Sequence, residues 1–255
     1  MRPFSAMVAG ELRARNWPRD ISDQLEKVPR ADLASANSEN PLARYFESHQ
    51  DGRGILKWLH YFDIYHRYFQ KFVGKEVHVV EIGIFSGGSL DMWKEYFGPN
   101  CRIYGVDIQE ECKAYEDART KIFVGDQGDR AFWQSFKRSV PRVDIVIDDG
   151  GHLPHQQMVT LEEMLPHVRP GGVFLCEDIH GVHQGFTAYS YGLADRLNAY
   201  ATNKEGSAIE PSEFQRSIHA VHLYPYVTVI EKADSVVDQF VCPGRGTEWA
   251  PFPLA

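Results

Sequence analysis

The chain has 255 residues, of which 43% are hydrophobic and 24% are charged, a composition typical of one large globular domain or of a domain with an extension. No apolar run approaches the roughly 18 residues of a membrane helix, and the N-terminal residues lack the apolar core of a signal peptide, so the sequence predicts a cytoplasmic protein without a membrane partner. The net charge of −8 disfavours a nucleic-acid partner, because acidic surfaces repel phosphate, and the four widely spaced cysteines indicate neither a zinc site nor a disulfide framework.

The first part of the chain, residues 1–40, is predicted to be a separate arm. Pro3, Pro18 and Pro29 interrupt it, and its opposite charges balance, so we expect it to lie outside the core. The next segment, residues 41–74, is rich in aromatic residues, and their spacing from Ile55 onward predicts a helix with one buried face. That helix either packs on the main core or forms a lid over a pocket.

From Val77 onward, short apolar strands alternate with helices. Strands are predicted at 77–83, 102–107, 121–124, 143–148 and 173–176, and helices at 90–97, 130–138 and 154–167. This alternation is typical of a parallel sheet covered on both faces. Two further strands, 218–224 and 227–231, are separated by too few residues for a helical crossover and are predicted to be antiparallel. We assign this domain to residues 75–240 and an irregular tail to residues 241–255.

Features that favour ligand binding follow the first three strands. The first strand runs into a glycine-rich turn at 83–89, where a ligand can approach the backbone. The second strand ends in Asp107, which could accept hydrogen bonds from ribose hydroxyls, and Asp126 follows the third. In the structural alternative, Asp107 caps the next helix and Asp126 closes a turn. All three features lie at the carboxyl ends of strands, where open α/β sheets bind ligands.

Acidic residues and histidines follow the fourth and fifth strands, in the segments 148–152 and 177–180. These strand ends are neighbours in a doubly wound sheet, and carboxylates so close together repel one another unless a cation lies between them. Oxygen ligands without a nearby cysteine favour Mg²⁺ over zinc. Of the two aspartates, Asp149 lies nearer the loop and is the expected ligand, whereas spacing alone does not decide the role of Asp148. The alternative is a capping aspartate and an ion-paired Glu177.

The E-x-G-x-x-x-G turn at 81–87, with acids after the second and third strands, resembles class I methyltransferases that use S-adenosylmethionine (SAM). The resemblance covers residues 77–232. It implies a Rossmann-like α/β fold whose sheet has seven strands, mostly parallel and ending in an antiparallel hairpin, with an N-terminal helical extension. It also implies a set of SAM-binding residues at the turn and the strand ends: Glu81, Gly83, Gly87, Ser89, Asp107, Asp126 and Gln127.

The block I-D-D-G-G-H at 147–152, followed by G-G-V-F-L-C-E-D at 171–178, resembles the metal-dependent sugar O-methyltransferases of the macrolide and methylmannose-polysaccharide types. The resemblance implies Mg²⁺ held by Asp149, Glu177 and Asp178, with His152 as the base. Gly151 stands where the family usually has serine. The upstream stretch 51–61 is closer to the methylmannose type. The expected substrate contacts are His60, Tyr65 and His180, although each also fits an ordinary structural role.

Together these features predict an O-methyltransferase that depends on SAM and Mg²⁺ and methylates a sugar hydroxyl of a small-molecule or oligosaccharide acceptor, as a homodimer. Two alternatives stay open at this point. The chain could methylate a catechol or another natural-product hydroxyl, or it could be a non-catalytic SAM-binding partner subunit. Catechol enzymes lack the D-D-G-G-H block, and the intact acidic segments with His152 argue against an inactive subunit.

Overall fold

The computed structural model describes residues 3–15, 39–181, 184–199, 204–205 and 208–247. The chain divides into two compact units, Met1–Glu39 and Asn40–Ala255. The described part of the first unit contains helix α1 (Pro3–Arg15), in which Arg15 pairs with Glu11 one turn earlier. Among the described residues, no helix is long and apolar enough to cross a bilayer.

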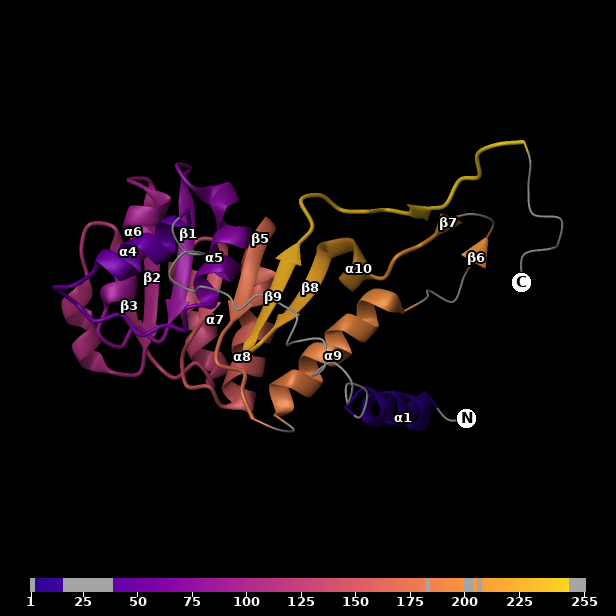
Figure 1. Cartoon of the computed structure of the whole chain (residues 1–255), viewed down its shortest axis with the longest axis horizontal. Helices are drawn as coiled ribbons and strands as arrows, with labels where there is room; N and C mark the ends of the chain where they lie inside the picture. The colour runs from indigo at the N-terminus through magenta and orange to yellow at the C-terminus, as the bar shows by residue number, and fades with distance from the viewer. Residues whose placement is uncertain (1–2, 16–38, 182–183, 200–203, 206–207, 248–255) are drawn as a thin grey trace, which may run out of the picture. The chain divides into compact units, whose positions relative to one another are not determined.

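The second unit is built on a seven-stranded sheet with the order β3-β2-β1-β4-β5-β9-β8 (Figure 1). Five strands run parallel: β1 (Val77–Ile82), β2 (Cys101–Asp107), β3 (Thr120–Val124), β4 (Val143–Asp148) and β5 (Val168–Cys176). Strand β9 (Val227–Lys232) pairs antiparallel with β5, and β8 (Ile218–Tyr224) pairs antiparallel with β9. This order confirms the predicted mostly parallel sheet and its closing hairpin.

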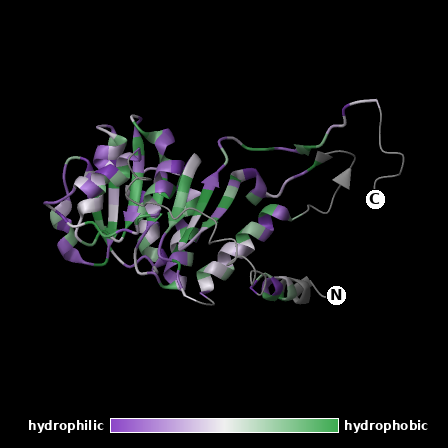
Figure 2. Cartoon of the chain, in the orientation of Figure 1, coloured by the Kyte–Doolittle hydropathy of each residue, from purple (hydrophilic) through white to green (hydrophobic). Residues whose placement is uncertain are grey.

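Helices cover both faces of this sheet, so that every residue of β1 is buried. One core cluster joins Val77 and Val79 of β1 to helices α4 (Pro41–Ser48), α5 (Tyr61–Phe69) and α6 (Gly88–Phe97). The other joins Val80 and Ile82 to α7 (Arg130–Ser139), α8 (Pro154–Met164) and α9 (Gly185–Asn198). Successive residues of a strand point to opposite faces, and Figure 2 shows the resulting concentration of hydrophobic residues in the central strands.

Shorter elements complete the unit. Three 3-10 helices lie at Gln70–Phe72 (η1), Glu110–Tyr115 (η2) and Leu165–His167 (η3), and a short helix α10 spans Glu213–Ser217. A second sheet pairs β10 (Phe240–Val241), β7 (Ala208–Ile209) and β6 (Lys204–Glu205). This small sheet, α9 and α10 were not predicted from the sequence. Within the described residues the tail after Val241 has no helix or strand, and residues 248–255 lie outside the description.

The helix predicted from Ile55 was wrong in its start, because α5 begins at Tyr61. Gly52, with φ +98°, and Gly54 precede this stretch, and glycine disfavours a helical backbone. Residues 55–58 instead run as a loop along the cavity described below. The aromatic face of α5 packs on the core. This confirms packing on the core, the first of the two predicted roles of this helix. The fifth strand also begins earlier than predicted, at Val168, and a register shift against β4 accommodates its glycines.

Candidate active site

A cavity of about 940 Å³ lies at the carboxyl ends of strands β1 to β5. Its wall includes the loops that follow these strands and the segment from Gly54 to Trp58. Ten predicted site residues line it: Gly83, Ser89, Asp107, Asp126, Gln127, Asp149, His152, Glu177, Asp178 and His180. Four do not: His60, Tyr65, Glu81 and Gly87. The sheet edge therefore gathers most of the predicted residues around one space.

The turn after β1 approaches the loop after β4 closely. Gly83 has φ +84°, and a Cβ at this position would lie 1.9 Å from the carbonyl oxygen of Asp149. Asp107 holds the same turn, since its Oδ2 accepts hydrogen bonds from the amides of Ile84 (2.8 Å) and Phe85 (3.2 Å). Its Oδ1 accepts from Gln109 N at 3.0 Å. A carboxylate has about four acceptor directions, so these three bonds shape the turn and leave Asp107 about one direction for a ligand.

Gln127 and Asp148 brace the D-D-G-G-H loop from behind. Gln127 is buried and donates to Asp148 Oδ1 (2.8 Å), while its Oε1 accepts from Gly151 N (2.6 Å). Burial raises the pKa of Asp148 to about 6. Asp126 is exposed, and its Oδ1 accepts from Gly128 N at 2.7 Å, which is the turn closure considered as the alternative. Both polar atoms of the Gln127 side chain thus have structural bonds, whereas Asp148 Oδ2 is buried without a hydrogen-bond partner.

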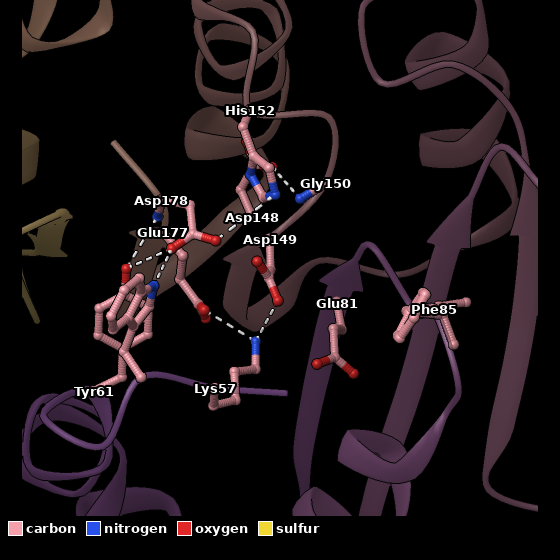
Figure 3. Close-up of polar contacts among 12 residues, drawn as sticks. Lys57, Tyr61, Glu81, Phe85, Asp148, Asp149, Gly150, His152, Glu177 and Asp178 are labelled. Atoms are coloured by element: carbon pink, nitrogen blue, oxygen red, sulfur yellow. Dashed lines mark hydrogen bonds and ion pairs between the residues drawn. The ribbon is translucent and has the colours of Figure 1, made fainter. Parts of the chain in front are cut away.

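The predicted base and two predicted metal ligands meet at one end of the cavity. Asp149, His152 and Asp178 each offer a ligand atom, and these atoms lie within 4.8 Å of one another. His152 Nε2 is 3.7 Å from Asp178 Oδ2 (Figure 3). Both His152 (φ 55°) and Asp178 (φ 51°) have a left-handed backbone, which is uncommon outside glycine and tends to occur at functional sites.

Glu177, the third predicted metal ligand, faces a lysine that the sequence analysis did not single out. The Lys57 ammonium is buried and lies 2.5 Å from Asp149 Oδ2 and 2.9 Å from Glu177 Oε2 (Figure 3). Burial by itself would lower the pKa of Lys57, but the charges of Glu177 and Asp149 outweigh it and raise that pKa. Glu177 therefore forms an ion pair, which was the structural alternative to its predicted role as a metal ligand. It is not part of the group formed by Asp149, His152 and Asp178.

Two further residues, Trp58 and Tyr61, fix the orientation of Asp178. The Tyr61 hydroxyl donates to Asp178 Oδ1 at 2.7 Å, and Trp58 Nε1 donates to the same oxygen at 3.1 Å. Burial and this contact with Asp178 raise the pKa of Tyr61, which keeps the hydroxyl protonated as a donor. The other oxygen, Oδ2, is the one that faces His152. The available signal in the sequence for these contacts with the acidic residues was a lysine and a tryptophan, Lys57 and Trp58, within the apolar run 55–59.

The predicted substrate contacts have different surroundings. Tyr65 is fully buried beneath Lys57, whose ammonium lies 5.9 Å from the ring centre. His60 contacts the carbonyl oxygen of Pro225 at 3.2 Å through its Nε2. Only His180 of the three lines the cavity, where it is exposed. Glu81 is buried behind the wall, with Trp93 Nε1 donating to it at 3.0 Å.

The charges and unpaired atoms at this end of the cavity fit a divalent cation. The carboxyl groups of Asp149, Glu177 and Asp178 lie at this end of the cavity beside the single positive charge of Lys57. Burial raises the pKa of Glu177 to about 8, so a bound cation would favour its ionised form. Glu177 Oε1 and His152 Nδ1 are buried without a hydrogen-bond partner. Buried polar atoms without a partner are uncommon in folded proteins, and a bound ion is one explanation for them. Carboxylate oxygens are the ligands that Mg²⁺ prefers. The donor set is thus suitable for Mg²⁺.

The sheet order, with its closing antiparallel hairpin, matches the class I methyltransferase fold. The family described as "Methyltransferase domain" matches residues 80–179. The chain is 32% identical over 199 residues to mycinamicin VI 2''-O-methyltransferase of Micromonospora griseorubida, covering 70% of this chain and 49% of the relative. It is 34% identical over 205 residues to demethylmacrocin O-methyltransferase of Streptomyces fradiae, covering 69% and 50%.

Among solved structures, the MycE methyltransferase of the mycinamycin biosynthetic pathway, in complex with Mg and SAH, is similar with a TM-score of 0.60 and 29% identity. The match covers 80% of this chain and 55% of that one. The chain spans about half the length of the curated relatives it matches. The relatives are named O-methyltransferases, and the MycE structure holds Mg and SAH, in agreement with the resemblance that the D-D-G-G-H block indicated.

Proposed function

We propose that the chain is a SAM- and Mg²⁺-dependent O-methyltransferase that acts on a sugar hydroxyl of a small glycoside or oligosaccharide. The observation that carries the proposal is the convergence of Asp149, His152 and Asp178 at one end of a cavity in a methyltransferase domain. The named O-methyltransferases that the chain resembles support it. Cytoplasmic location and homodimeric assembly stay predictions from the sequence.

We assign the metal to Asp149, Asp178 and, through its free oxygen, Glu177. When bound there, a divalent cation lowers the pKa of a hydroxyl group that it coordinates. His152 then accepts the hydroxyl proton, because its ring lies beside the metal-binding carboxylates. The oxygen forms a bond to the methyl carbon as the methyl–sulfur bond breaks, and the electron pair of that bond goes to sulfur. Asp178 Oδ2, 3.7 Å from His152 Nε2, stabilises the imidazolium that results.

The remaining cavity accommodates the methyl donor. A sulfonium methyl donor supplies an electrophilic methyl group. Gly83 and Ser89 line the part next to β1, and Asp107 and Asp126 line the parts next to β2 and β3. These residues position the donor, and the segment from Gly54 to Trp58 forms part of the cavity wall. Positioning and exclusion of water contribute strongly to a transfer reaction of this kind.

The test compares metal removal with two variants of the site. Chelator should abolish methyl transfer to a simple mannoside, and Mg²⁺ should restore it. Asp149→Asn should weaken Mn²⁺ binding, measured by electron paramagnetic resonance, with SAH affinity little changed. His152→Ala should keep both affinities and reduce kcat by about 10²–10⁴-fold, the usual contribution of a general base.

Each outcome of this test has a definite meaning. Full activity in chelator would contradict the metal assignment. Normal kcat in His152→Ala would exclude this histidine as the base. Turnover of catechols but of no glycoside would replace the sugar acceptor with a catechol. Absence of SAH binding would contradict the proposal as a whole.

A further inference from the structure

Aromatic side chains gather beside the acidic end of the cavity and form a surface that we call the aromatic platform, consisting of Trp58, Tyr226, His180 and His60. Trp58 and Tyr226 are 53% and 42% exposed, and their ring centres lie 5.8 Å apart. The ring of His180 meets Tyr226 edge-on at 5.9 Å, and His60 lies 6.3 Å from it. Two large rings and two imidazoles therefore share one exposed patch.

The platform is assembled from three separate segments that are tied together. Trp58 and His60 precede α5, His180 follows β5, and Tyr226 lies in the turn between β8 and β9. The carbonyl oxygen of Tyr226 accepts from Ile179 N at 3.0 Å, which joins the turn to the loop after β5. The contact between His60 and Pro225 O joins the same turn to α5. These bonds fix the relative positions of the rings.

The backbone of Tyr226 indicates that its exposure is not incidental. Its φ of +65° is unfavourable for a residue with a bulky side chain. Such strain persists only where the surroundings enforce it, and it is concentrated at binding and catalytic sites. Here the enforced conformation holds an aromatic ring at the surface instead of in the core.

The platform directly adjoins the cluster of Asp149, His152 and Asp178, which we call the acid group. Trp58 donates to Asp178 Oδ1 at 3.1 Å, and both Trp58 and His180 line the cavity. A molecule whose hydroxyl reaches His152 must therefore have its neighbouring atoms close to the indole. The surface offers flat apolar faces flanked by imidazole nitrogens that can donate or accept hydrogen bonds.

A pyranose ring matches this chemistry. One face of such a ring carries C–H groups that pack on an aromatic face, while its hydroxyls lie around the edge and need polar partners. We propose that the aromatic platform binds the C–H face of the acceptor sugar, with Trp58 and Tyr226 as the residues that determine specificity. This inference rests on the proposed function and adds to it the surface that recognises the sugar.

Tyr226 provides the sharper test, because its side chain has no contact with the acid group. Tyr226→Asn removes the ring but tolerates a left-handed backbone, and Tyr226→Phe keeps the ring as the matched control. Binding of methyl α-mannoside and methyl α-rhamnoside to the protein loaded with Mg²⁺ and SAH is measured by calorimetry and by saturation-transfer NMR. We expect the Kd of the better ligand to rise about ten-fold in Tyr226→Asn and to stay within about two-fold in Tyr226→Phe.

Trp58 gives a second variant with its own control. Trp58→Phe keeps a ring but loses the bond to Asp178, whereas Trp58→Leu loses both. If the platform binds sugar, Trp58→Leu weakens the glycoside more than Trp58→Phe does. Affinity for SAH and the midpoint of thermal unfolding are measured for every variant, so that a folding defect is recognised as such.

The outcomes separate the platform from the proposed function. A wild-type protein that methylates a glycoside, with unchanged glycoside affinity in Tyr226→Asn and Trp58→Leu, would overturn the platform and leave the function intact. A wild-type protein that neither binds nor methylates any glycoside, but turns over a catechol, would overturn both. Loss of affinity in Tyr226→Phe equal to that in Tyr226→Asn would assign the effect to the hydroxyl and also contradict stacking.

Discussion

Lys57 connects the segment before α5 to both acidic strand ends. Its partners Asp149 and Glu177 lie 92 and 120 residues away in the sequence, and its side chain is only 4% exposed. Loss of one partner from a buried ion pair leaves an unpaired charge in a medium of low polarity, which is more destabilising than loss of the whole pair.

We therefore expect Lys57→Met to lower the free energy of unfolding by about 3–5 kcal/mol, as measured by urea denaturation. The double variant Lys57→Met/Glu177→Gln should recover part of this loss, because it removes one of the charges that Lys57 neutralised. A single variant as stable as the wild type would mean that solvent reaches these carboxylates.

The acids of the site could be predicted from the sequence, whereas their contacts could not. Asp149, His152 and Asp178 follow apolar runs that identify neighbouring strands, so their proximity depends only on the sheet order. The pairing of Glu177 with Lys57 depends on the path of residues 49–60, where the spacing from Ile55 predicted a helix and the structure has a loop. Gln127 was predicted to contact SAM, but its position between Asp148 and Gly151 depends on packing that spacing does not reveal.

Among the elements, the turn after β1 has no room for a side chain at Gly83. Gly83→Ala should lose about 1–2 kcal/mol for its left-handed backbone and a further 1–3 kcal/mol for the overlap with Asp149 O, and it should weaken SAH binding. Gly74→Ala is the matched control, because Gly74 has a similar φ of +75° but no atom within 4 Å of the added Cβ. Urea denaturation and calorimetry compare the two, and equal losses would contradict the role of the close approach.

The central strands β1 and β4 were predictable because both of their faces are buried, and buried strands are apolar runs with clear ends. Helix α9 was missed since Gly185 and Gly192 obscure its pattern, and its buried residues Phe186, Ser190 and Leu193 include a polar one. The short strands of the second sheet have two residues each, too few for any periodicity to be visible.

For the whole molecule, the division at Glu39 and Asn40 falls one residue before the predicted end of the arm. Among the residues that the structure describes, the two core clusters use only those after this division. We expect a chain that begins at Asn40 to fold and to bind SAH with the affinity of the full chain. Thermal unfolding and calorimetry test this, and size-exclusion chromatography shows whether the removed residues affect assembly. An insoluble or SAH-deficient truncation would place the arm in the core.

The left-handed backbones of His152 and Asp178 have a consequence for attempts to stabilise the protein. A residue without a Cβ relieves the strain at such a position, so a screen for heat resistance alone would favour glycine at both. The same substitutions remove the proposed base and a proposed metal ligand. Selection for durability and selection for turnover would therefore act in opposite directions at these two positions, and thermostable variants are best sought among residues remote from the cavity.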